Sequence, residues 1–281
     1  MIAETAPTVQ NLPVFETRLV TPDDAKQWLA NTPPGANRPL SKPYVEMYAR
    51  IMGRGDWVLN GDVIRINSAG GVDDGQHRLH AVIAHGHPVM MSVARNCERH
   101  GIDAGKPRTV ANQFAIDGVQ QSARIVAALR WLRRYTLGQI DLTSNKFAEA
   151  VDYGEMRDLF EAAPGIAASV ACTGGTVLSA TPQSVLAFVH FMGSKTSPEK
   201  ATEFVSLLHS GAELHNTSPV LALIKAGRNL GAKGVQLHRD RMCALTVKAW
   251  VMFEAGLKCK LLRIGANEPF PRFRTNWPDP D

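Results

Sequence analysis

The chain has 281 residues, of which 44% are hydrophobic and 20% are charged, and it carries a net charge of +5. This composition is that of an ordinary globular protein, which excludes a low-complexity chain, while the small positive excess permits a polyanionic partner. Apolar runs stay well short of the roughly 20 residues that cross a bilayer, and residues 1–10 lack a basic stretch followed by an apolar one, so we expect a soluble cytoplasmic protein.

The first 100 residues alternate short strand-like and helix-like segments. Strands are expected at 15–20, 63–66, 72–73 and 88–93, with a hairpin joining the second and third. Helices are expected to begin after Thr21 and Ser41, which are good N-caps, and at Gln76, and Gly86 is expected to end the third. Residues 1–100 are therefore predicted to form a small mixed α/β domain.

Helical periodicity dominates after residue 100, and strand-like alternation nearly disappears. Helices are expected at 119–137, 147–160, 182–192, 198–208, 219–230 and 239–255. Thr181, Ser197 and Ser218 each precede a proline and are predicted to cap three of these helices. Residues 101–281 are thus expected to form a helical domain with a proline-rich C-terminal arm, and the fold class is α+β.

The run Asp74-Gly75-Gln76-His77-Arg78 holds the densest group of chemically active side chains. It lies at an expected strand-to-helix junction, where a glycine lets the backbone turn sharply and the first amides of the helix lack intrahelical partners. Such junctions bind anions, so the run predicts phosphate recognition. The chain has no Walker A motif, and nucleotide binding would therefore use this turn.

The surrounding residues extend this motif. Trp57 and Asn60-Gly61 precede it, and Gly86 and Pro88-Val89 follow it. Over about residues 15–96 the pattern resembles the ParB/sulfiredoxin superfamily, and its Asp-Gly-Gln-His-Arg spelling is most similar to the DGQHR proteins of DNA sulfur and deazaguanine modification systems and to ParB-like phage proteins. The resemblance implies a ParB/sulfiredoxin-like fold and a nucleotide phosphate near the motif, but leaves the reaction open.

Several roles follow from the resemblance. Gly75, Gln76 and Arg78 would bind the phosphates of ATP or CTP, while Asp74 and His77 would serve as catalytic residues. Asp73 and Asp74 would be the ligands of Mg²⁺. Alternatively, Asp74 merely caps the helix, and His77 and Arg78 are solvated residues of its first turn.

The loop of residues 103–109 offers further cations. Lys106 and Arg108 are expected to fold over the phosphate, with Thr109 as the N-cap of the next helix. A basic linker between domains is the alternative.

Two well-known activities of the superfamily do not fit the chain. The arginine-rich form of the motif found in partition clamps is replaced here, and no helix-turn-helix module follows, which argues against clamp-type chromosome partition. Sulfiredoxin chemistry requires a cysteine within the motif, and none is present.

The four cysteines form no C-x-x-C pair and are expected to be reduced and mostly buried thiols. His77, His80, His85 and His87 lack a standard zinc spacing and are expected to be scattered rather than to share a metal.

Basic residues recur in groups in the second half of the chain. Arg130, Arg133 and Arg134 are expected to point away from the apolar face of their helix, where they would contact DNA or remain solvated. The other groups are Arg239 and Arg241; Lys258, Lys260 and Arg263; and Arg272 and Arg274.

The sequence thus predicts a nucleotide- or phosphate-binding ParB-like protein that acts on or beside DNA, as an NTPase or phosphoryl-transfer enzyme in a phage or DNA-modification context. The alternatives are a non-catalytic DNA-binding or regulatory protein and a Mg²⁺-dependent ParB-like nuclease. The sequence leaves the oligomeric state open, with a homodimer among the alternatives.

Overall fold

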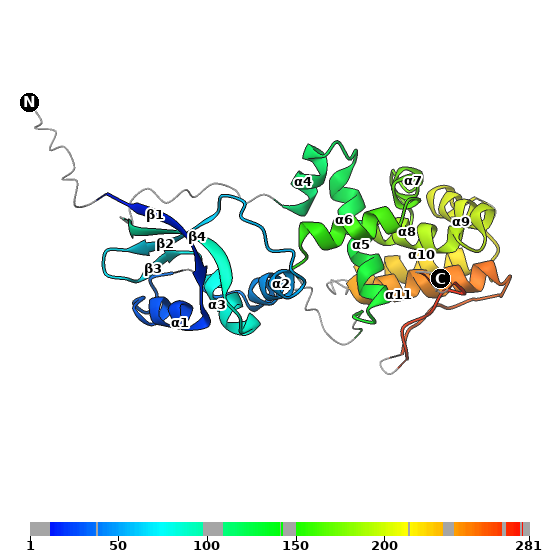
Figure 1. Cartoon of the computed structure of the whole chain (residues 1–281). Helices are drawn as coiled ribbons and strands as arrows, with labels where there is room; N and C mark the ends of the chain where they lie inside the picture. The colour runs from blue at the N-terminus through cyan, green and yellow to red at the C-terminus, as the bar shows by residue number, and fades with distance from the viewer. Residues whose placement is uncertain are drawn as a thin grey trace, which may run out of the picture. The chain divides into compact units, whose positions relative to one another are not determined.

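The computed structural model describes residues 12–37, 39–97, 109–140, 142, 150–212, 214–232, 239–265, 268–275 and 277. Within these residues the fold is α+β, with eleven helices and one four-stranded mixed sheet (Figure 1). The chain divides into two compact units. The N-terminal unit comprises Met1–Pro107 and Ala148–Asp152, and the helical unit comprises Arg108–Phe147 and Tyr153–Asp281.

The N-terminal unit contains the sheet. Its strands are β1 (Val14–Val20), β2 (Val63–Asn67), β3 (Val72–Asp74) and β4 (Val89–Cys97), in the spatial order β1-β4-β2-β3. β4 pairs antiparallel with β1 and parallel with β2, whereas β2 and β3 form an antiparallel pair. The expected hairpin is therefore present, and it delivers β3 directly to the start of the third helix.

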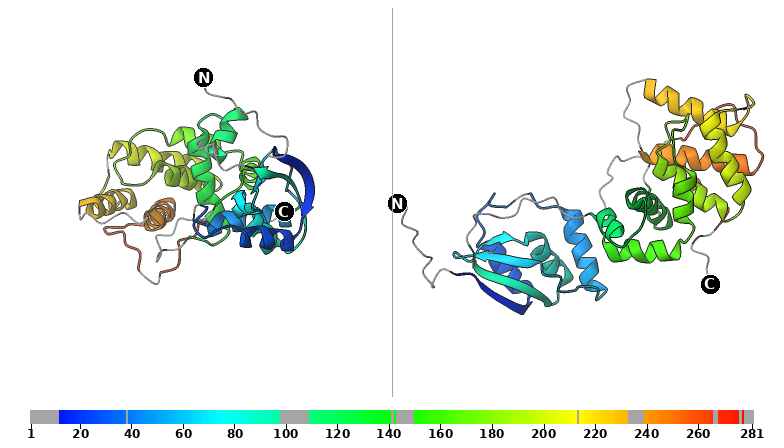
Figure 2. Two further views of the ribbon diagram at one scale, coloured as in Figure 1. Left: turned by 90° about the vertical axis from the view of Figure 1, so that its left-hand side faces the viewer. Right: turned by 90° about the horizontal axis from the view of Figure 1, so that it is seen from above.

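Three helices cover one face of this sheet: α1 (Pro22–Ala30), α2 (Lys42–Gly53) and α3 (Gln76–His85) (Figure 1). Seen from above, the strands lie in front of α1 and α3 (Figure 2). Ile64 and Val93 from the strands and Leu79 from α3 form the core between the layers, each at most 1% exposed. Alternate strand residues point to the other face, where Phe15, Leu19 and Met90 are 70%, 53% and 43% exposed.

The N-caps of the first two helices differ. Thr21 forms a capping box with Asp24, in which each side chain accepts a hydrogen bond from the backbone N–H of the other residue. Ser41 occupies the N-cap of α2 but makes no side-chain capping bond. The N-cap prediction is thus confirmed in full at Thr21 and only in position at Ser41.

The helical unit consists of eight helices in its described part. They are α4 (Val110–Ile116), α5 (Ser122–Thr136), α6 (Tyr153–Ala162), α7 (Ile166–Cys172), α8 (Gln183–Ser194), α9 (Pro198–Ser210), α10 (Pro219–Ala232) and α11 (Arg239–Glu254). Every residue of α8 from Val185 to Gly193 is buried. A helix that is apolar on all sides belongs at the centre of its unit, and α8 packs against α5, α7, α9 and α11.

Some predictions for this unit are wrong in detail. The helix expected from residue 147 begins at Tyr153, residues 143–149 lie outside the described part, and α7 was not predicted. Pro182 rather than Thr181 is the N-cap of α8, and Ser197 makes no side-chain capping bond. Instead, the Thr181 hydroxyl is buried and hydrogen-bonds to Ser179 and to Thr246 of α11. The Thr181 hydroxyl therefore bonds to residues packed against it instead of capping α8.

The chain after α11 runs without a helix or strand through its described residues, as expected for the C-terminal arm. Phe273 of this segment is 7% exposed and packs against Tyr135 and Phe188. All four cysteines are free, and three of them are buried. No helix in the described part of the chain is both long and apolar enough to cross a membrane.

Candidate functional site

The predicted site begins at a glycine that the backbone requires. Gly75 is the N-cap of α3 and adopts the left-handed conformation, with φ of 100°. A Cβ at this position would lie 2.4 Å from Cδ1 of Ile64, so any side chain would be both strained and obstructed. Gly75 also provides no capping side chain. The turn between β3 and α3 is therefore compact, and the positive end of the α3 dipole lies directly behind it.

Arg78 fixes this turn to the sheet. Its guanidinium donates a 3.0 Å hydrogen bond from Nη2 to the carbonyl oxygen of Val63 and lies 3.4 Å from Oδ2 of Asp74. The Arg78 side chain is only 12% exposed. The alternative in which Arg78 is merely a solvated first-turn residue is thus wrong. Its contact with phosphate stays a prediction, since its described contacts are within the protein.

Asp74 is the carboxylate of the motif that reaches solvent. Its side chain is 45% exposed, and in the β2–β3 register it lies opposite Arg65. Arg65 in turn pairs with Ala94, and Ala94 with Phe15, which places Asp74 on the sheet face that the helices leave open. Asp74 is therefore a half-exposed carboxylate that contacts Arg78 and lies opposite Arg65 in the sheet.

Asp73 lies in a different environment. It is 8% exposed, its Oδ1 accepts a 3.0 Å hydrogen bond from Nδ2 of Asn67, and its Oδ2 is buried with no hydrogen-bond partner among the described residues. Its contacts are thus separate from those of Asp74. The described residues contain no group of three or more His, Cys, Asp or Glu that could hold a metal ion. Binding of Mg²⁺ by Asp73 and Asp74 stays a prediction.

His77 links α3 to α2. Its Nε2 accepts a 2.9 Å hydrogen bond from the backbone N–H of Ser41, and its ring lies edge-on to Tyr44 at 6.2 Å between centroids. Because Nε2 is an acceptor here, the ring in this arrangement is neutral and carries its proton on Nδ1. His77 is thus more than a solvated first-turn residue. Gln76 is half-buried in the same turn.

Other predicted residues are placed as follows. Lys106 and Arg108 lie outside the described residues, whereas Thr109 caps α4 by accepting a hydrogen bond from the N–H of Asn112. The rings of His85 and His87 contact each other at 5.2 Å, and burial lowers the pKa of His80.

The three arginines predicted to contact DNA occupy different environments. Arg133 is 6% exposed and donates to Glu155 of α6, and Arg134 donates to the buried carboxylate of Asp240 in α11. The expectation that Arg133 points away from the packed face of α5 is wrong, because α6 contributes an acidic partner on that side. Arg133 and Arg134 are thus used to hold helices together.

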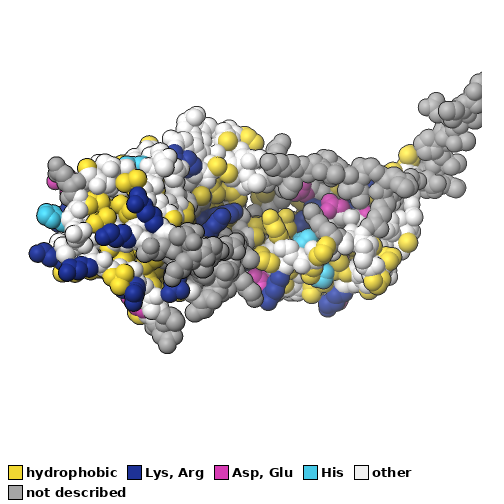
Figure 3. All heavy atoms as spheres, turned by 180° about the vertical axis from the view of Figure 1, so that it is seen from behind, with side chains coloured by type: hydrophobic (Ala, Val, Ile, Leu, Met, Phe, Trp, Pro, Cys, Tyr) yellow, Lys and Arg dark blue, Asp and Glu magenta, His cyan; other side chains and the backbone are white. Residues whose placement is uncertain are grey.

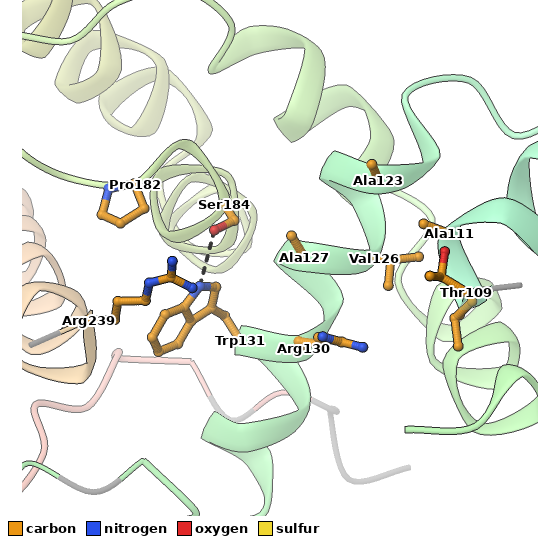
Figure 4. Close-up of a pocket in the computed structure, with 11 residues that line it drawn as sticks. Thr109, Ala111, Ala123, Val126, Ala127, Arg130, Trp131, Pro182, Ser184 and Arg239 are labelled. Atoms are coloured by element: carbon orange, nitrogen blue, oxygen red, sulfur yellow. Dashed lines mark hydrogen bonds between the residues drawn. The ribbon is translucent and has the colours of Figure 1, made fainter. Parts of the chain in front are cut away.

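Arg130 lines a cavity of the helical unit. The cavity has a volume of about 460 Å³ and lies between α5, the start of α4 and the start of α8 (Figure 4). Its lining includes Thr109, Ala127, Trp131, Ser184 and Arg239. The indole of Trp131 donates to Oγ of Ser184 at 3.2 Å, which fixes the ring in the wall. This hollow was not predicted, because its residues come from four separate segments.

The positive charge of the chain is concentrated in α11 and the segment that follows it. Residues 239–275 contain eight Lys or Arg and three Asp or Glu, a net charge of +5 that equals that of the whole chain. Two of the acids, Asp240 and Glu254, are buried, and the third, Glu268, pairs with Lys248. Figure 3 shows many Lys and Arg side chains and few acidic ones on one face of the helical unit. The basic groups that the sequence analysis found at 239–241, 258–263 and 272–274 all belong to this region.

The structure thus brings Asp74, Gly75, His77 and Arg78 together at one turn, whereas Arg133 and Arg134 pair with acidic residues of the helical unit. No protein-family model, curated protein or solved structure matches the chain.

Proposed function

We propose that the turn from Asp74 to Arg78 binds the phosphate of a nucleoside triphosphate, ATP or CTP, and that the protein is a ParB/sulfiredoxin-like enzyme or switch acting on or beside DNA. The observation that carries this proposal is the uncapped start of α3 behind Gly75, next to the half-exposed carboxylate of Asp74. Backbone amides at such a position bind phosphate oxygens, and the helix dipole favours the negative charge.

The side chains around the turn have different roles in this proposal. Arg78 holds Asp74 and the strand carbonyl of Val63, so it positions the turn. Arg65, opposite Asp74 in the register, adds a second positive charge at the open sheet face. Asp74 is then the group placed to orient a cation or accept a proton, with His77 beside it in the same turn.

Mg²⁺ fits this arrangement only when the phosphates of a nucleotide are bound as well. Mg²⁺ in nucleotide sites usually takes one or two carboxylates plus phosphate oxygens and water. Asp74 supplies one exposed carboxylate, and Asp73 is buried and bonded to Asn67. Asp74 would therefore hold the ion through the phosphates that the turn binds, and Mg²⁺ would supply charge neutralisation at those phosphates.

The basic C-terminal segment supports DNA as the second partner. Seven of its eight Lys and Arg residues are exposed, which is the distribution expected for phosphate-backbone contacts. They are Arg239, Arg241, Lys258, Lys260, Arg263, Arg272 and Arg274.

Isothermal titration with ATP, CTP and GTP, each with and without Mg²⁺, tests nucleotide binding. We expect one of them to bind more tightly with Mg²⁺, and Asp74→Asn to remove that Mg²⁺ dependence. Asp23→Asn is the matched control, because Asp23 is a 90% exposed carboxylate on α1 that pairs only with Lys26 among its described contacts. Absence of nucleotide binding in the wild-type chain contradicts the proposal.

The same variants separate the two alternatives. A non-catalytic DNA-binding protein would bind DNA equally well after Asp74→Asn and His77→Ala. A Mg²⁺-dependent nuclease would nick plasmid DNA, and the nicking would stop with EDTA and in Asp74→Asn.

A further inference from the structure

The cavity of the helical unit is a candidate site independent of the α3 turn. Its walls near α5 are made by small apolar side chains, including Ala123, Val126 and Ala127, which leave room for a ligand. Its volume of about 460 Å³ lies within the range of small-molecule sites. Trp131 and Pro182 add flat apolar surface.

The charged residues that line this cavity are all positive. Arg130 and Arg239 border it, and no Asp or Glu is among the described residues that do so. The Nε of Arg130 is buried and has no hydrogen-bond partner in the described part of the chain. In Figure 4 the Arg130 side chain extends toward Thr109, and Arg239 lies on the other side of Trp131. A buried guanidinium nitrogen without a partner is unfavourable, and an oxyanion would satisfy it.

We propose that this cavity binds a small phosphate monoester or carboxylate with an apolar, preferably aromatic, body. Arg130 binds the oxyanion, and Arg239 adds positive charge. The alanines and the ring of Trp131 contact the apolar body. A free small molecule is favoured over a nucleic-acid backbone because the site is a hollow with apolar walls, whereas backbone phosphates are usually bound on exposed basic surfaces.

Titration with phenyl phosphate, benzoate and adenosine monophosphate, using the full chain, tests this proposal. We expect at least one to bind more tightly than inorganic phosphate, which has no apolar body. Arg130→Gln should weaken that binding by about tenfold or more, as expected for a charge-assisted bond. Arg228→Gln should leave it unchanged, because Arg228 is exposed on α10 and does not line the cavity.

A second variant tests the hollow without changing the charge. Ala127→Leu should fill the space and abolish binding while Arg130 remains. The indole N–H signal of Trp131, identified with Trp131→Phe, should shift on binding because the ring lies in the wall. The proposal is overturned if none of the three compounds binds, or if binding is the same in Arg130→Gln and Ala127→Leu as in the wild-type chain.

A single-stranded oligonucleotide of twelve thymidines distinguishes the other source of phosphate. If Arg130→Gln weakens binding of this oligonucleotide but not of the small compounds, Arg130 contacts a nucleic-acid backbone and the small-molecule site is refuted. If Arg130→Gln weakens binding of the small compounds but not of the oligonucleotide, the cavity is a small-molecule site. Failure of nucleotide titration at the α3 turn affects neither result, since the two sites lie in different units.

Discussion

At the scale of single residues, the candidate site depends on one glycine and on side chains that hydrogen-bond to the backbone of neighbouring elements. Gly75 supplies the left-handed turn, and Arg78 binds the carbonyl of Val63. The sequence predicted which residues gather at this turn, because glycine and helix-start signals are local. It could not predict which of them reach solvent, because Val63 and Ser41, the partners of Arg78 and His77, come from 15 and 36 residues away.

Replacing Gly75 should destabilise the N-terminal unit strongly. Gly75→Ala combines a left-handed backbone with a Cβ 2.4 Å from Ile64, and we expect a loss of about 2 kcal/mol or more. Gly86→Ala is the matched control, since Gly86 has φ of 79° but nothing within 4 Å of its Cβ position, and it should cost about 1 kcal/mol. Hydrogen exchange of β4 measures both, and equal protection in the two variants would refute this account of Gly75.

At the scale of elements, local signals predicted most of the N-terminal unit and less of the helical one. The alternation in β1 and the Thr21 cap with its acidic first turn placed these elements correctly. In the helical unit the amphipathic pattern of α5 indicated one buried face, whereas α4, α6, α7 and α8 all pack against it. Arg133 therefore became buried, because the pattern of one helix does not reveal an acidic partner on another.

The capping box of α1 should give a pH-dependent contribution to stability. Burial by itself would raise the pKa of Asp24, but hydrogen bonds from Thr21 and the charge of Arg18 outweigh it and hold the pKa below its ordinary value. The stabilisation is therefore present above the unfolded value near 3.8 and is lost as pH falls through the lower folded pKa.

Asp24→Asn should consequently reduce the free energy of unfolding of the N-terminal unit by about 1 kcal/mol at pH 7, and by less at pH 2 to 3. Urea denaturation at the two pH values measures this difference. Asp23→Asn, which removes a charge from the same helix turn without touching the cap, should have little effect at either pH. An equal loss at both pH values would show that the Asp24 charge does not act through the cap.

At the scale of the whole molecule, the charge is distributed unevenly. Residues 239–275 carry a net charge equal to that of the entire chain, so the remaining residues are balanced. Binding of a polyanion should therefore depend on this segment and weaken steeply with salt.

Fluorescence anisotropy with a duplex oligonucleotide at several salt concentrations measures this dependence. Combined replacement of Lys258, Lys260 and Arg263 by Ala should reduce the slope of log affinity against log salt by roughly two to three. Replacement of Lys195, Lys225 and Arg228, which are exposed on or just after α8 and on α10, removes the same charge elsewhere. A similar loss of slope in both triple variants would show that only net charge matters.

The central claim is that phosphate binds at the start of α3, and an NMR titration of the ¹⁵N-labelled, deuterated chain with ATP or CTP and Mg²⁺ tests it most directly. We predict saturable shifts of the backbone amide signals of Gly75, Gln76, His77 and Arg78, which Asp74→Asn weakens. Saturable nucleotide binding that leaves these four amides unshifted would contradict the claim.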